Sequence, residues 1–121
     1  DLPLTTSGWV DTGVRPVALI DSGADYTIEN PDLVAAHGGW ALFYSAGYYG
    51  DRDYRTSFAH CSTPVGPCTR SPDKFLATGG TRVGPGGASF AQDLFGRWWT
   101  AYHSGLALEG GRELRTSPVA L

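Results

Sequence analysis

The sequence predicts an all-β fold, and three observations support this prediction. Short apolar and aromatic runs recur along the chain, bounded by Gly, Pro, Asp or Ser, whereas helical signals are weak. The run Tyr54–His60 alternates with a period of two, which suits a sheet with one drier face. A strand, a tight turn and an aromatic strand occur at Asn30–Ala46 and again at Gly87–His103, an offset of about 57 residues, close to one propeller blade. We therefore expect two antiparallel units of the four-stranded type.

Seven runs have the composition of strands. They are Arg15–Ile20, Pro31–Ala36, Trp40–Ala46, Tyr54–His60, Ala88–Gln92, Arg97–His103 and Arg112–Ser117. Both faces of Trp40–Ala46 are partly apolar, as expected for a strand packed between neighbouring sheets. His37-Gly38-Gly39 and Leu94-Phe95-Gly96 supply the turns, since glycine adopts positive φ freely.

Composition limits the classes of function. The 121 residues suffice for one modest domain, and 41% hydrophobic residues argue against disorder. Basic residues are scattered singly and the net charge is -3, so no nucleic-acid partner is expected. No apolar run approaches the roughly 18 residues of a membrane span. The first residue is Asp1 rather than Met, which indicates a mature form or a fragment.

The two cysteines, Cys61 and Cys68, flank a run of turn formers, Ser62–Pro67. We expect them to form a disulfide, which would contribute roughly 2–3 kcal/mol on the chain-entropy model. Two free thiols or a zinc pair are the alternatives, although zinc prefers four ligands and no second cysteine pair exists. A disulfide would favour an oxidising setting, so a secreted protein is expected.

Glu29 precedes the first strand of the first repeat, and the alternation allows a geometric inference. If Glu29 lies at the mouth end of an inner strand, the chain runs away from the mouth and reverses at Gly38-Gly39. The loop 47–53 then emerges on the same face as Glu29, as do the segment 79–87 and the loop after His103. A sugar cleft needs flat aromatic faces and polar side chains. Residues of these types in this loop are Tyr48, Tyr49, Asp51, Arg52 and Asp53.

The motifs and their order resemble the C-terminal part of the five-bladed β-propeller glycoside hydrolases of family 43. The motifs that carry the resemblance are Ile28-Glu29-Asn30-Pro31, Val83-Gly84-Pro85-Gly86-Gly87, Trp98-Trp99-Thr100-Ala101-Tyr102-His103 and Gly110-Gly111-Arg112. The resemblance runs from Glu29 to the C-terminus. It implies about two blades of a five-bladed propeller, with residues 1–121 forming a single partial propeller domain. It also implies an inverting arabinofuranosidase, arabinanase or β-xylosidase type of activity.

The resemblance assigns Glu29 the role of the general acid that protonates the leaving sugar oxygen. Inverting enzymes place the acid and a base roughly 6.5–9.5 Å apart, on opposite faces of the sugar. The family's base Asp and modulating Asp lie in earlier blades, and no position here matches either motif. The substrate-binding residues expected from the cleft are Tyr48, Tyr49, Asp51, Asp53 and Arg112, although Arg112 would equally suit a surface ion pair.

Two further expectations follow from these motifs. Many family members carry a His after Gly-Pro-Gly that helps to hold a central metal ion, but this chain has Gly87 there. No metal and no other cofactor are therefore expected. Asp21-Ser22-Gly23-Ala24-Asp25 has the composition of an Asx-type turn, not of a catalytic motif.

Three hypotheses about function remain. The first is a glycoside hydrolase of which this chain carries the acid half, with missing upstream blades as its partner and a carbohydrate as its substrate. The chain would then be inactive in isolation. The second is a non-catalytic carbohydrate-binding or remnant propeller fragment, and the third is a structural fragment that associates with copies of itself. The sequence upstream of Asp1 would distinguish them.

Overall fold

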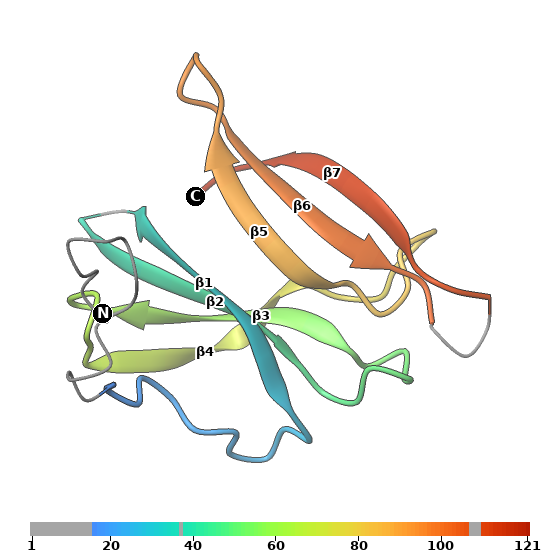
Figure 1. Ribbon diagram of the computed structural model, residues 1–121, viewed down its shortest axis with the longest axis horizontal. Coiled ribbons are helices and arrows are strands. Elements are labelled where there is room, and N and C mark those ends of the chain that lie inside the picture. Colours follow the sequence, from blue (N-terminus) through green and yellow to red (C-terminus); the bar gives the residue numbers. More distant parts are fainter. Residues whose placement is uncertain (1–15, 37, 107–109) are drawn as a thin grey trace, which may run out of the picture.

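A computed structural model describes residues 16–36, 38–106 and 110–121, and these residues form two antiparallel sheets with no helix (Figure 1). The strands are β1 (Ile28–Ala36), β2 (Gly39–Ala46), β3 (Arg55–Cys61), β4 (Cys68–Leu76), β5 (Gly86–Gln92), β6 (Trp98–Ser104) and β7 (Glu113–Val119). Within these ranges the structure accordingly contains no helix that could span a lipid bilayer. The predicted all-β class is confirmed.

The two sheets repeat one antiparallel meander. The first sheet has the order β1-β2-β3-β4 and the second has the order β5-β6-β7. Corresponding strands begin at Ile28 and Gly86, at Gly39 and Trp98, and at Arg55 and Glu113, which confirms a repeat of about 58 residues. The expectation of four strands holds for the first sheet, whereas the second sheet has three strands in the described part of the chain.

Six of the seven predicted runs overlap observed strands, and one prediction is wrong. Residues 16–20 form no strand, and Arg15 lies outside the described residues. Leu19 and Ile20 instead pack against the apolar face of the first sheet, so burial explains their composition without strand pairing. Strand β4 was absent from the seven runs, because its polar and partly exposed residues Ser71-Pro72-Asp73-Lys74 hide the strand pattern.

Strand β2 lies at the centre of the packing, and both of its faces are buried as predicted. Leu42 and Tyr44 face the cluster that Leu19 and Ile20 join. Phe43 faces the opposite way and stacks on Phe90 of β5, with ring centroids 4.0 Å apart. The two sheets therefore pack together through the Phe43 side of β2.

The turns and the disulfide follow the sequence pattern. Gly38 and Gly96 both have φ of +76° in the β1–β2 and β5–β6 hairpins, while His37 lies outside the described residues. Cys61 and Cys68 face each other across β3 and β4 and form a disulfide, as predicted.

Candidate functional site

Glu29 is the second residue of β1, and a β-bulge sets the direction of its side chain. Glu29 pairs with Ser45 and Asp32 pairs with Phe43, so Asn30 and Pro31 together oppose one residue of β2. Asn30 has φ of +53°, a left-handed conformation that asparagine tolerates better than most residues. The bulge is also one of the few places where a sheet accepts proline.

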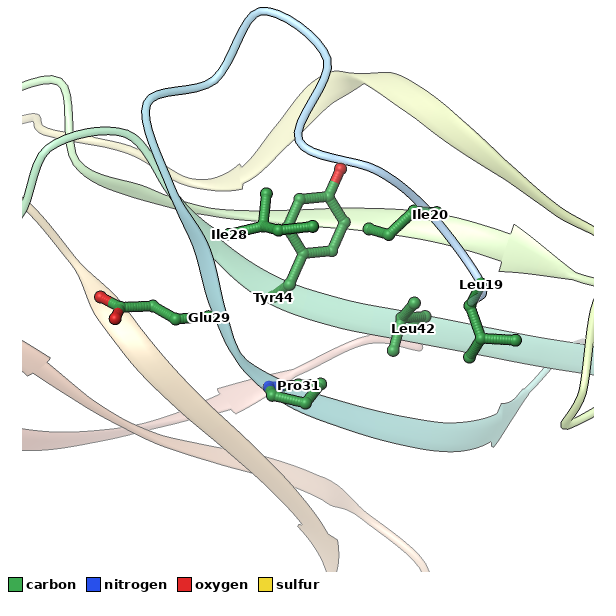
Figure 2. A pocket seen from close by; sticks show the side chains of 7 residues that line it. All are labelled: Leu19, Ile20, Ile28, Glu29, Pro31, Leu42 and Tyr44. Carbon is green, nitrogen blue, oxygen red and sulfur yellow. The ribbon is translucent and has the colours of Figure 1, made fainter. Parts of the chain in front are cut away.

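Glu29 and Ile28 are neighbours in the strand and point to opposite faces of the first sheet, and the bulge places Glu29 on the face opposite to Leu33. Figure 2 shows the carboxylate of Glu29 directed away from the apolar side chains of Ile28 and Tyr44, which line a cavity of about 190 Å³. Glu29 is also among the residues that line this cavity, but its carboxylate points away from the cavity. Glu29 itself remains exposed, so its carboxylate is accessible from solvent.

The carboxylate of Glu29 has one close partner, the phenol of Tyr54. The hydroxyl of Tyr54 donates a hydrogen bond of 2.5 Å to Oε1 of Glu29. Tyr54 is only 1% exposed, and a Cβ on Gly86 of β5 would lie 2.2 Å from its Cε1. Glycine at position 86 therefore provides the space that the ring occupies. Burial, together with the bond to Glu29, raises the pKa of Tyr54, so the phenol stays protonated as a donor.

His103 of β6 also packs against the ring of Tyr54. The imidazole and the Tyr54 ring are nearly parallel, at 9°, with centroids 5.8 Å apart. A Cβ on Gly87 would lie 2.8 Å from Cδ2 of His103, so the imidazole occupies the space beside that glycine. Burial lowers the pKa of His103, the charge of Arg112 lowers it further, and Glu29 acts in the opposite direction. Nδ1 of His103 is buried without a hydrogen-bond partner among the described residues.

Arg112 connects the predicted loop with the Glu29–Tyr54 pair. Its guanidinium lies 5.8 Å from the ring centroid of Tyr49 and 5.6 Å from that of Tyr54. Nη2 of Arg112 also donates to the carbonyl of Tyr49 at 3.2 Å. The contacts of Arg112 thus bring the segment after β6 and the loop 47–53 together beside Tyr54, the partner of Glu29, and a role of Arg112 in substrate binding stays a prediction.

The tyrosines of the loop are partly open to solvent. Tyr48 is 37% exposed and Tyr49 is 46% exposed, with their ring centroids 4.8 Å apart. Tyr26, which the sequence analysis did not single out, lies edge to face with Tyr48 at 5.3 Å. Two hydrogen bonds between Thr27 and Gly47 hold these segments together. The result is a group of exposed tyrosine rings that adjoins Arg112 through Tyr49.

The two loop aspartates lie at the same turn with exposed side chains. The amide of Tyr54 donates to the carbonyl of Asp51 at 3.2 Å, and Arg55 donates to the carbonyl of Asp53 at 3.2 Å. Their carboxylates therefore remain available to a polar ligand. In the described part of the chain, no three His, Cys, Asp or Glu side chains gather as metal ligands.

Comparison with known proteins identifies this architecture. No family model matches the chain, and no curated protein matches it. A thermostable family 43 glycoside hydrolase superposes with a TM-score of 0.69 and 25% identity, over 78% of this chain and 32% of that one. The chain shares its fold with family 43 glycoside hydrolases. The chain spans less than half of the length of the family 43 structures that it matches. Their fold is a five-bladed propeller, and the chain corresponds to about two of its blades.

Two other structures with this fold superpose on nearly the whole chain. The BlXynB protein from Bacillus licheniformis gives a TM-score of 0.79 at 20% identity and covers 98% of this chain and 25% of that one. An α-L-arabinofuranosidase from Lactobacillus brevis gives 0.74 at 20% identity, over 97% and 42%. The resemblance stated from the motifs is therefore confirmed at the level of the fold.

Proposed function

We propose that this chain is the acid-bearing part of an inverting glycoside hydrolase, with Glu29 as the general acid. The observation that carries the proposal is the position of Glu29. Its carboxylate lies at the head of β1, exposed to solvent, and accepts a hydrogen bond from a buried phenol. Arg112 lies over the ring of that phenol and over the ring of Tyr49 in the loop. A general acid must be accessible to the leaving oxygen and held in a fixed orientation.

The remaining residues fit the binding of a sugar. Tyr48 and Tyr49 offer partly exposed aromatic faces, while Arg112, Asp51 and Asp53 offer polar groups for hydroxyls. The substrate class proposed is arabinose- or xylose-containing plant polysaccharides, since the similar folds include an endo-arabinase, a xylosidase and an arabinofuranosidase. The disulfide supports secretion of such an enzyme.

The base that activates water is proposed to come from upstream blades, so the isolated chain should be inactive. The test joins the chain to upstream family 43 blades and measures hydrolysis of arabino- and xylo-oligosaccharides. The anomer of the first product, read by proton NMR, should be inverted. Glu29→Gln should abolish cleavage of substrates with poor leaving groups, whereas activated aryl glycosides should lose much less, because they need little proton assistance.

Glu113→Gln is the matched control, since Glu113 is an exposed residue of β7 that pairs with Arg115. This variant should keep activity on both kinds of substrate. Equal losses on both substrates in Glu29→Gln would show that Glu29 is not the general acid. Strong activity of the isolated chain would show that the base lies within its 121 residues.

A second candidate function is a non-catalytic carbohydrate-binding module, which the exposed tyrosine group Tyr26, Tyr48 and Tyr49 favours. Such a module would bind oligosaccharides equally well with and without Glu29, and joined upstream blades would add no turnover. Self-association is the third reading. Leu114 of β7, the outer strand of the second sheet, is 91% exposed. Sedimentation of the chain over a range of concentrations would reveal self-association.

A further inference from the structure

We propose that Tyr54 is the positioning residue of Glu29: it fixes one carboxylate oxygen so that the other carries the proton to the leaving sugar oxygen. This inference rests on the proposed function and extends it to a residue outside the set expected from the sequence. The basis is the hydrogen bond of 2.5 Å from the Tyr54 hydroxyl to Oε1 of Glu29.

The surroundings of Tyr54 leave its ring little freedom. The backbone of Gly86 lies against one edge, the imidazole of His103 is nearly parallel to the ring, and Arg112 lies over it at 5.6 Å. The residue is 1% exposed, and its phenol has two side-chain partners, Glu29 and Ser45. The contact with Ser45 lowers the pKa of Tyr54, as a bond donated to the phenol oxygen does, so the hydroxyl proton is left to be donated to Glu29.

The bond to Tyr54 assists the proton transfer itself. In the acid form, the proton sits on Oε2 while Oε1 accepts from the phenol. As the proton passes from Oε2 to the glycosidic oxygen, the bond from that oxygen to the anomeric carbon breaks and water attacks that carbon, giving its own proton to the upstream base. Glu29 is then a carboxylate, and its bond with Tyr54 becomes charge-assisted and stronger. An interaction that strengthens along the reaction lowers the barrier.

The first test compares Tyr54→Phe with the wild type in the protein joined to upstream blades. The ratio of kcat on a poor leaving group to kcat on an activated aryl glycoside should fall about tenfold. Both substrates are measured in the same sample, so any loss of folded protein cancels in this ratio. Tyr44→Phe is the matched control, because it removes another buried hydroxyl, one that accepts from Arg70 at 2.9 Å on the opposite face of β2. The control should leave the ratio unchanged.

The second test needs no turnover and uses the chain itself. The sequence has three glutamates, so carboxyl ¹³C labelling of glutamate gives three resonances, and Glu29→Gln assigns the one of interest. In Tyr54→Phe the Glu29 carboxyl resonance should move from its wild-type position at the same pH, because Oε1 loses the hydrogen-bond donor that lies 2.5 Å away. His103 and Arg112 also face this pair and are unchanged in the variant. Tyr44→Phe should leave the Glu29 resonance at its wild-type position.

The outcomes separate the two proposals. An unchanged Glu29 carboxyl resonance in Tyr54→Phe, or equal losses on both substrates, would overturn the positioning role. If the joined wild-type protein cleaves neither substrate, the proposed function fails, while the carboxyl resonance still decides whether Tyr54 holds the carboxylate of Glu29 in place.

Discussion

The carboxylate of Asp25 accepts a hydrogen bond from the guanidinium of Arg70, and this pair ties the segment before β1 to strand β4. The same carboxylate also pairs with Arg55, at the start of β3. Arg70 further donates to the carbonyl of Ser22 at 3.0 Å. The run 21–25, predicted as a turn, is therefore a turn with a structural ion-pair network.

Asp25→Asn should destabilise the chain by about 1–3 kcal/mol, because it leaves two partly buried guanidinium groups without their counter-charge. Urea unfolding followed by circular dichroism measures the change. Asp73→Asn, at an exposed position of β4, is the control and should stay within about 0.5 kcal/mol of the wild type. Equal stabilities of the two variants would show that the network contributes nothing.

Gly86→Ala should destabilise the chain by about 1–3 kcal/mol, because the added Cβ would collide with the ring of Tyr54. Gly79→Ala offers a control, since a Cβ at that position meets no atom within 4 Å. In the joined protein, Gly86→Ala should also reduce cleavage of poor leaving groups. A Gly86→Ala variant as stable as Gly79→Ala would contradict the close contact described for Tyr54.

His103 predicts a pH dependence of stability. Its pKa in the folded chain is lowered from 6.5 by burial and by Arg112, so the unfolded chain binds more protons as the pH falls. Stability is therefore fully present above pH 6.5 and is lost progressively below it. His103→Gln should remove part of this loss, which urea unfolding between pH 7.5 and pH 5 would measure. Parallel curves for the wild type and the variant would rule out this contribution of His103.

The disulfide predicts that unfolded, unreduced protein has no titratable thiol. Replacing both Cys61 and Cys68 with serine should lower stability by roughly 2–3 kcal/mol, since the unfolded chain gains freedom. Thiol titration with and without a reductant checks the first statement, and thermal unfolding checks the second. Two reactive thiols before reduction would show that the bond does not form in solution.

The sequence predicted those parts of the molecule that depend on local pattern. Alternation located β2 and its two buried faces, and the turn residues located the hairpins. Glu29 and the loop 47–53 could be placed on one face because strand direction follows from counting turns. The prediction for Arg15–Ile20 failed because apolar residues that pack on a sheet resemble residues that form one.

Contacts between distant strands could not be predicted in this way. Tyr54 and His103 were seen only as strand residues, since period-two alternation gives the face of a side chain but not the residue that it meets from another sheet. Gly86 and Gly87 gave a signal in retrospect, because adjacent glycines often mark a site where another group approaches closely. The aromatic partner of Tyr48 was likewise hidden, since Tyr26 and Tyr48 both lie outside the predicted strands and alternation says nothing about contacts between loops.

The extra residue in β1 has a consequence for comparing related sequences. Counting regular alternation back from Leu33 would assign Glu29 to the apolar face, and the bulge at Asn30 and Pro31 reverses that assignment. A relative that lacks one of these two residues would form a regular ladder and still direct its glutamate to the same face. In an alignment, a relative with a gap of one residue just before Asp32 can therefore still present its glutamate as the acid. A relative without the gap can do so only if its residue at position 30 tolerates positive φ.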